Sequence, residues 1–235
     1  MILIGLVVFL AAMIQGLLGF GGALIAMPLL VIIIGIKTAT PVYALVGILS
    51  TLLNAIRLRE HTTPRDLVKL VAPAIMGIPL GILLLSRVDS VYVTATLGII
   101  LILYATYNLF GWSMPALTNP AWAYLAGFSS GILSGAFNAG GPPVIVYAST
   151  RSWSADRFRG NLQTYFLIIS VFLLLGHGVS GNLSPDVWRM AFFAVPALIV
   201  GQWVGVRLCH IMNPDHFRKL VLVFLLILGA QLLVS

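Results

Sequence analysis

The sequence predicts an all-α integral membrane protein, and three observations support this fold class: its composition, a long uncharged stretch, and continuous apolar runs. Hydrophobic residues make up 60% of the 235-residue chain and charged residues only 8%, whereas a soluble domain carries about 25% charged residues. Residues 90–150 contain no Asp, Glu, Lys or Arg. Such a chain would not stay dispersed in water, so a soluble globular domain is excluded.

The apolar runs are long enough to cross a bilayer as helices. The hydrocarbon core is about 30 Å thick, so a spanning helix needs roughly 20 apolar residues. The first run begins at Met1 without the basic region of a cleaved signal peptide, so we expect it to be the first membrane segment. The runs cover residues 1–35, 40–56, 70–86, 90–110, 121–150, 160–180, 187–206 and 217–234.

Glycine and proline interrupt the two longest runs. The first contains the glycine-rich stretch Gly16–Gly22, followed by Pro28, and the fifth contains the stretch Gly131–Pro143. Because proline and closely spaced glycines disfavour a continuous helix, both runs are expected to be broken. Each run has room for two short half-helices joined by a turn, although a kinked continuous span is the alternative.

The two interrupted runs resemble copies of one sequence. A shift of 119 residues aligns Gly16 with Gly135, and it aligns the pair Gly21-Gly22 with the pair Gly140-Gly141. This correspondence is the first sign of an internal duplication.

A second pair of motifs repeats in the same order. A proline followed by Gly-x-x-x-Gly occurs within residues 73–81 and again within residues 196–205. We expect these glycines to allow close packing of helices. Two matching blocks in one order predict two repeats, 1–112 and 119–235, joined by the uncharged link 113–120 within one transmembrane domain.

The positions of Lys and Arg predict how the halves are oriented. If all eight runs crossed the bilayer, the basic residues would divide eight to five, which is a poor positive-inside bias. If the two glycine-rich runs enter and return on the same side, the division becomes ten to three. One side then holds Arg57, Arg59, Arg65, Lys69, Arg151, Arg157, Arg159, Arg207, Arg218 and Lys219, and the other holds Lys37, Arg87 and Arg189.

Each half would then be one re-entrant or broken segment plus three transmembrane helices. Because three crossings is an odd number, the second half would be inverted relative to the first, with both termini on the non-cytoplasmic side. The net charge of +7 is explained by this topology, so no nucleic acid partner is expected.

The breaks themselves predict a binding site. Non-helical backbone within a membrane is tolerated where protein buries it or where it lines a water-filled cavity, and in inverted-repeat transporters it marks the substrate site. The N-terminus of a half-helix presents free N–H groups and a positive partial charge, which favours an anion. Pro142 and Pro143 suit the first turn of a helix, so one half-helix should begin there.

Polar side chains close to the breaks complete the predicted site. Gln15 precedes Gly16 and Asn138 lies between Gly135 and Gly140, and both amides could donate to an anion. Each amide could instead be a bond between helices. The predicted substrate-binding residues are Gln15, Gly21, Gly22, Asn54, Asn138, Gly140, Gly141 and Gln163, of which Asn54 and Gln163 are the weaker candidates.

Other chemistry has little support in the sequence. No Asp or Glu lies at the centre of an apolar run, where cation and proton relays usually place one. The single Cys209 and the scattered His61, His177, His210 and His216 do not have the spacing of metal ligands or of a catalytic group. We therefore expect neither an enzyme nor a metal or cofactor.

The segments Gln15–Gly22 and Gly135–Pro143 resemble the two signatures of the sulfite exporter TauE/SafE family. The duplication, length and loop charges extend the resemblance over essentially the whole chain. It implies a multi-pass transporter of a bacterial-type inner membrane for sulfite, sulfonates or related small organic or sulfur oxyanions. It also implies a binding role for Gln15, Gly21, Gly22, Asn138, Gly140 and Gly141.

The leading interpretation is a secondary transporter that exposes one central site alternately to the two sides. Its expected partners are a small anionic substrate and the lipid bilayer, and a homo-oligomer remains open. An anion channel with the same site and a non-transporting membrane scaffold are the alternatives. Saturable flux with counterflow would distinguish a carrier from a channel, and a scaffold would leave the paired breaks unexplained.

Overall fold

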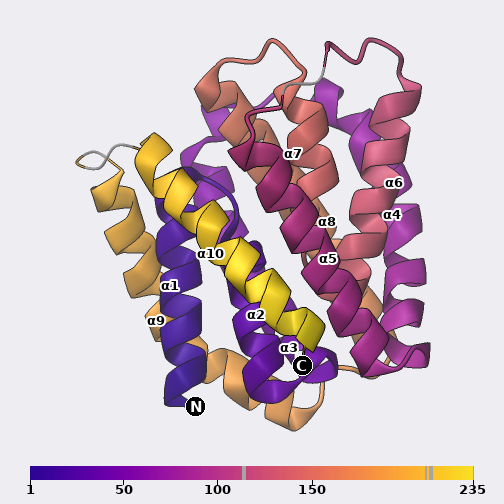
Figure 1. The fold of residues 1–235 in the computed structure, drawn as a ribbon, viewed down its shortest axis with the longest axis vertical. Helices are drawn as coiled ribbons and strands as arrows, with labels where there is room; N and C mark the ends of the chain where they lie inside the picture. The colour runs from indigo at the N-terminus through magenta and orange to yellow at the C-terminus, as the bar shows by residue number, and fades with distance from the viewer. Residues whose placement is uncertain (113–114, 210, 212–213, 235) are drawn as a thin grey trace.

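A computed structural model describes residues 1–112, 115–209, 211 and 214–234, which form α-helices and one short 3-10 turn with no β-strand. The all-helical fold class is therefore confirmed for these residues (Figure 1). Part of the predicted link, Ser113 and Met114, lies outside them, as does His210. The elements are α1 (Ile2–Leu18), α2 (Gly22–Ile34), α3 (Ile36–Arg57), η1 (Arg59–His61), α4 (Pro64–Arg87), α5 (Ser90–Leu109), α6 (Ala121–Phe137), α7 (Gly141–Ser149), α8 (Ala155–Val179), α9 (Pro185–Leu208) and α10 (Pro214–Val234).

The first interrupted run is a hairpin of two short helices, α1 and α2. The helix α1 ends at Gly19 with φ 80°, and α2 follows Gly21 with φ 90°. These left-handed conformations are costly for any residue with a Cβ, which explains the glycines. A Cβ at Gly22 would overlap Gln15 Oε1 and approach the Ala11 carbonyl oxygen. The start of α2 therefore lies directly against α1, which means that the chain turns back along α1 and does not continue as a kinked span.

The second interrupted run, α6 and α7, is also a hairpin of two short helices, with Gly140 at φ −71° where its counterpart Gly21 has φ 90°. Asn138 ends α6 with φ 55°, and it is the described non-glycine residue that has a positive φ. A Cβ at Gly140 would overlap Ser134 Oγ and the Ser130 carbonyl oxygen, so this chain also turns back on itself. The helix α7 begins at Gly141 with prolines in its first turn, as the sequence predicted.

Six of the described helices are long and apolar enough to cross a membrane: α3, α4, α5, α8, α9 and α10. Three of these follow each broken segment along the chain. The protein is thus a multi-pass membrane protein. The division into two inverted repeats stays a prediction.

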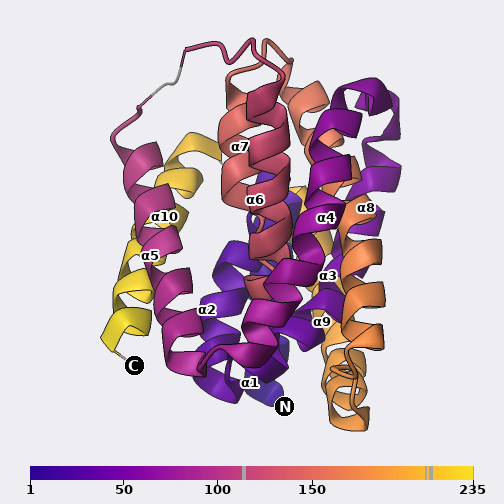
Figure 2. The same cartoon turned by 90° about the vertical axis from the view of Figure 1, so that its right-hand side faces the viewer.

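The helix ends separate the basic residues as the sequence predicted. The start of α1 and the end of α10 lie at one end of the molecule, and the loops after α3, α5 and α7 lie at the other (Figures 1 and 2). Lys37, Arg87 and Arg189 occur at the start of α3, the end of α4 and the start of α9, toward the end that holds both termini. We call the opposite end, which carries most of the Lys and Arg, the basic end.

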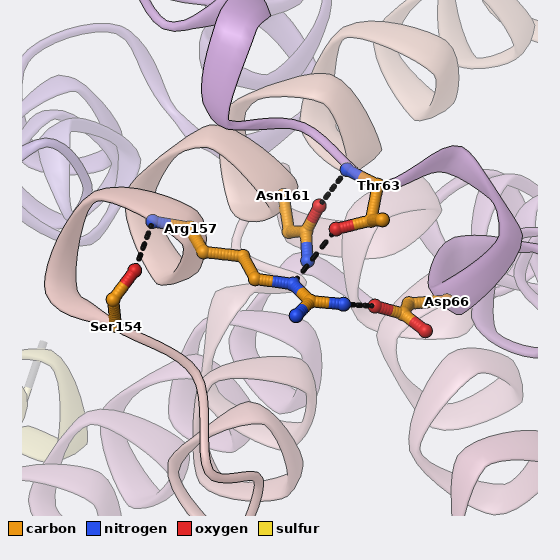
Figure 3. Close-up of polar contacts among 5 residues, drawn as sticks. All are labelled: Thr63, Asp66, Ser154, Arg157 and Asn161. Atoms are coloured by element: carbon orange, nitrogen blue, oxygen red, sulfur yellow. Dashed lines mark hydrogen bonds and ion pairs between the residues drawn. The ribbon is translucent and has the colours of Figure 1, made fainter.

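At the basic end, polar contacts fasten the start of α8 to the start of α4 (Figure 3). Arg157 pairs with Asp66 at 2.7 Å and donates from Nε to Thr63 Oγ1 at 2.8 Å. The Thr63 N–H donates to Asn161 Oδ1 at 2.8 Å. The ion pair is partly exposed, so it contributes at most about 1 kcal/mol and mainly fixes the relative position of the two helices.

The two halves pack closely through glycines. A Cβ at Gly77 or Gly81 of α4 would overlap a backbone carbonyl oxygen of α6, and one at Gly201 or Gly205 of α9 would overlap a carbonyl oxygen of α1. The predicted packing role of these glycines is therefore confirmed. Each short first helix, α1 or α6, is thus held in backbone contact with a long helix of the other half.

This packing predicts a difference between two glycines of the α1–α9 interface. A methyl group at Gly205 meets the backbone at Met13, which cannot move aside, whereas one at Gly5 meets side chains at 3.7 Å, an ordinary contact. Gly205→Ala should lower the free energy of unfolding by about 1–3 kcal/mol through overpacking. Gly5→Ala should leave it unchanged or raise it by up to about 1 kcal/mol through helix propensity. Thermal melts of the two purified variants check this, and equal melting points would contradict it.

Candidate functional site

The two breaks meet at one central cavity of about 70 Å³. The ends of α1 and α6, the starts of α2 and α7, and the inner faces of α3 and α8 form its walls. A single water molecule needs roughly 10–15 Å³ of such cavity space. The cavity therefore accommodates a small ion with some of its water. Its polar lining side chains are Gln15, Tyr43, Thr51, Ser134, Asn138 and Ser170.

Most of the predicted site residues come together here. They belong to two groups, one at each break, that lie more than a hundred positions apart in the sequence. Their role in binding a ligand stays a prediction. The ones that line the central cavity are Gln15, Gly21, Gly22, Asn138, Gly140 and Gly141.

Gln15 is held at the mouth of the first break by the tight packing of α1 on α2. Its side chain is 6% exposed, and its Oε1 atom lies where a Cβ of residue 22 would be. Only glycine at position 22 leaves room for this amide. The amide therefore lies beside the first N–H groups of α2, which are the natural donors to an anion.

Asn138 has a structural contact in addition to its place in the cavity wall. Its Nδ2 atom donates to the Thr40 carbonyl oxygen of α3 at 3.1 Å. One of the two amide hydrogens is therefore used to hold the second break against the other half. The first break is also bonded to the other half, but as the acceptor: Gln163 Nε2 of α8 donates to the carbonyl oxygen of Gly19.

Asn54 and Gln163, the two weaker predictions, do not line the cavity. Asn54 is 2% exposed and accepts from Gln202 Nε2 at 2.8 Å, while its own Nδ2 donates to the Ser50 carbonyl oxygen at 3.1 Å. Ser50 Oγ in turn donates to Gln202 Oε1 at 2.9 Å. This arrangement favours the alternative role of these amides as bonds between helices.

Sequence reasoning missed several lining residues. Ser134 could have been found, because the shift of 119 that relates the two breaks places it opposite Gln15. Tyr43 and Thr51 of α3 and Ser170 of α8 carry no such signal, since they belong to helices without a matching motif. Only the packing of α3 and α8 against the breaks brings them to the cavity.

The electrostatics of the cavity come from backbone and neutral side chains. No described lining residue carries a charge. The helix α2 begins with two adjacent free N–H groups, those of Gly22 and Ala23, because the Leu24 N–H donates to the Gly21 carbonyl oxygen at 3.1 Å. Prolines 142 and 143 leave α7 only the separated N–H groups of Gly141 and Val144 in its first four residues. The positive end of α2 is therefore the stronger anion-binding element of the two.

The described histidines and acidic residues do not gather into a metal site. Within the part of the chain that the structure describes, no three His, Cys, Asp or Glu residues lie close enough to hold a metal ion. His177 is buried at the end of α8, where its Nδ1 lies 3.1 Å from Asn182 Nδ2. It follows the cavity-lining residue Leu173 by four positions on α8 and does not itself line the central cavity.

Comparisons with known proteins place the chain in a family. The family model of the sulfite exporter TauE/SafE matches residues 4–232, nearly the whole chain. A protein of Cupriavidus necator described as "Probable sulfite/organosulfonate exporter TauE" is 27% identical over 110 residues. That match covers 47% of this chain and 43% of the relative, less than half of either protein. No solved structure matches the chain.

Removing the Gln15 amide tests the cavity as a binding site. If sulfite binds beside α2, it should raise the free energy of unfolding by about 2.7 kcal/mol at a hundredfold excess over Kd, and so raise the melting point of the purified protein. Gln15→Leu should weaken this binding about 10- to 100-fold, because a hydrogen bond to a charged group contributes about 1.5–3 kcal/mol.

Asn54→Leu is the matched control, since Asn54 is a buried amide of the same bundle that does not reach the cavity. It should lower the basal melting point and keep the shift caused by sulfite. A sulfite shift that survives in Gln15→Leu but disappears in Asn54→Leu would contradict the placement of the site.

Proposed function

Because the chain belongs to the sulfite exporter TauE/SafE family, we propose that it is a secondary transporter of small sulfur oxyanions or sulfonates. The substrate would bind in the central cavity, which would open alternately to the two sides of a bacterial inner membrane. The observation that carries this proposal is the meeting of two helix breaks at one uncharged cavity. The protein would move its substrate across the membrane without changing it chemically.

The chemistry of the cavity suits an anion that must also leave. Free N–H groups at the start of α2, together with the Gln15 amide and the Ser134 hydroxyl, can surround oxyanion atoms with donors. A buried Lys or Arg would hold the same anion more strongly and would hinder its release. Neutral donors therefore favour transport over permanent binding.

The arrangement of the helices supports two inverted repeats, 1–112 and 119–235. If α1–α5 correspond in order to α6–α10, the observed pairing of α1 with α9 is matched by that of α6 with α4. The pairs α3–α8 and α5–α10 each join corresponding helices. This relation is what two inverted copies around a central site would produce, and we propose that they rock against one another.

Transport in proteoliposomes tests the proposal. Labelled sulfite should enter with saturable kinetics, and sulfite inside the vesicles should accelerate its entry by counterflow. Gly22→Ala forces a methyl group into the space of the Gln15 amide and should lower the transport rate at least tenfold, in line with the loss of one hydrogen bond to a charged group.

The control is Gly5→Ala on the same helical hairpin, which meets only ordinary contacts and should transport normally. Flux that rises linearly with concentration and lacks counterflow would favour a channel. A folded protein that moves none of sulfite, thiosulfate, sulfoacetate or acetate would favour a scaffold and overturn the proposal.

A further inference from the structure

A second cavity opens beside the central one, and we call it the vestibule. It has a volume of about 570 Å³ and lies between α5, α7, α8 and α10. Its lining includes Asn108 and Trp112 at the end of α5 and Arg218 and Lys219 near the start of α10. It is larger than the central cavity and, unlike it, is lined by basic side chains.

One of the two basic groups of the vestibule, Arg218, is held in place by a hydrogen bond. Arg218 Nη2 donates to Asn108 Oδ1 at 2.5 Å, which ties the guanidinium of α10 to the end of α5. A guanidinium has five N–H donors, so this bond leaves others for a ligand. No Asp or Glu occurs among the described residues that line the vestibule, so its field favours anions.

The vestibule and the central cavity share a wall. Phe20 and Ile145 line both cavities. Phe20 belongs to the first break, between two glycines with positive φ, and its ring packs edge-on against Phe158 with centroids 6.1 Å apart. Ile145 lies on α7, just after the second break. Two apolar side chains, one from each break, therefore separate the basic vestibule from the neutral central cavity.

We propose that the vestibule is a second anion-binding site, which loads the central cavity through the wall formed by Phe20 and Ile145. It takes the same chemical class of ligand as the proposed function on which this inference rests: a small oxyanion or sulfonate whose oxygen atoms match the guanidinium fork. Because the vestibule lies at the basic end, it serves the cytoplasmic side under the positive-inside rule. The anion is concentrated by charge first and then bound by neutral donors.

The ordinary explanation of Arg218 and Lys219 is that they only set the membrane topology. Neutralising Arg218 alone cannot separate the two roles. A comparison with a matched arginine outside the vestibule can. Arg65 lies at the same basic end, at the start of α4, is exposed, and does not line the vestibule. Arg65→Gln and Arg218→Gln therefore remove the same charge from the same end of the molecule.

The first measurement is sulfite transport from the basic side at varied concentration and ionic strength. Arg218→Gln should raise KM about tenfold with little change in the maximal rate, and it should flatten the dependence on salt. Arg65→Gln should behave like the unchanged protein. Equal effects of the two substitutions, or a fall in maximal rate with unchanged KM in Arg218→Gln, would overturn the proposal.

The second measurement does not require transport. Calorimetric titration of the detergent-solubilised protein with sodium sulfite should reveal two sites, of which Arg218→Gln removes one and Gln15→Leu the other. If the unchanged protein binds at two sites but transports nothing, the proposed function fails and the vestibule site stands. If titration shows a single site that only Gln15→Leu removes, the vestibule proposal fails while the central site stands.

Discussion

The structure depends on how the free backbone groups of two broken helices are satisfied inside an apolar bundle. Lipid cannot bond these groups, so protein must. In the second break, Ser130 Oγ of α6 donates to the Gly140 carbonyl oxygen. Two further contacts, one at each break, join the breaks to the other half of the chain. Gln163 of α8 donates to the Gly19 carbonyl oxygen of the first break, and Asn138 of the second break donates to the Thr40 carbonyl oxygen of α3. The cavity lies where these two cross-contacts bring the breaks together.

The same exchange between halves governs the packing around the cavity. The helix α1 lies in backbone contact with α9, and α6 with α4, because glycines remove the side chains that would separate them. Neither hairpin can therefore be displaced without moving a long helix of the other half. This mechanical coupling suits the alternating access that we propose, and it follows from small residues at a few positions.

The sequence predicted the helical class, both breaks and the glycines and amides beside the breaks that line the cavity, because glycine and proline leave a direct trace of a broken helix. It also predicted the packing glycines. It did not reveal the contacts at Gly19 and Thr40, since a backbone carbonyl that accepts a bond has no signature in the sequence. Pro142 and Pro143 show a further limit: they mark the start of α7 correctly, yet they remove two of its N–H donors and make the pair of helix starts unequal.

The central claim is that an oxyanion binds between the two breaks, nearest the start of α2. Anomalous diffraction from crystals grown with selenite, a heavier analogue of sulfite, would locate the anion directly. The account predicts a selenium peak within reach of Gln15, Gly22 and Ser134. Clear anomalous peaks confined to the vestibule, or to the opposite end of the molecule, while the central cavity holds none, would contradict it.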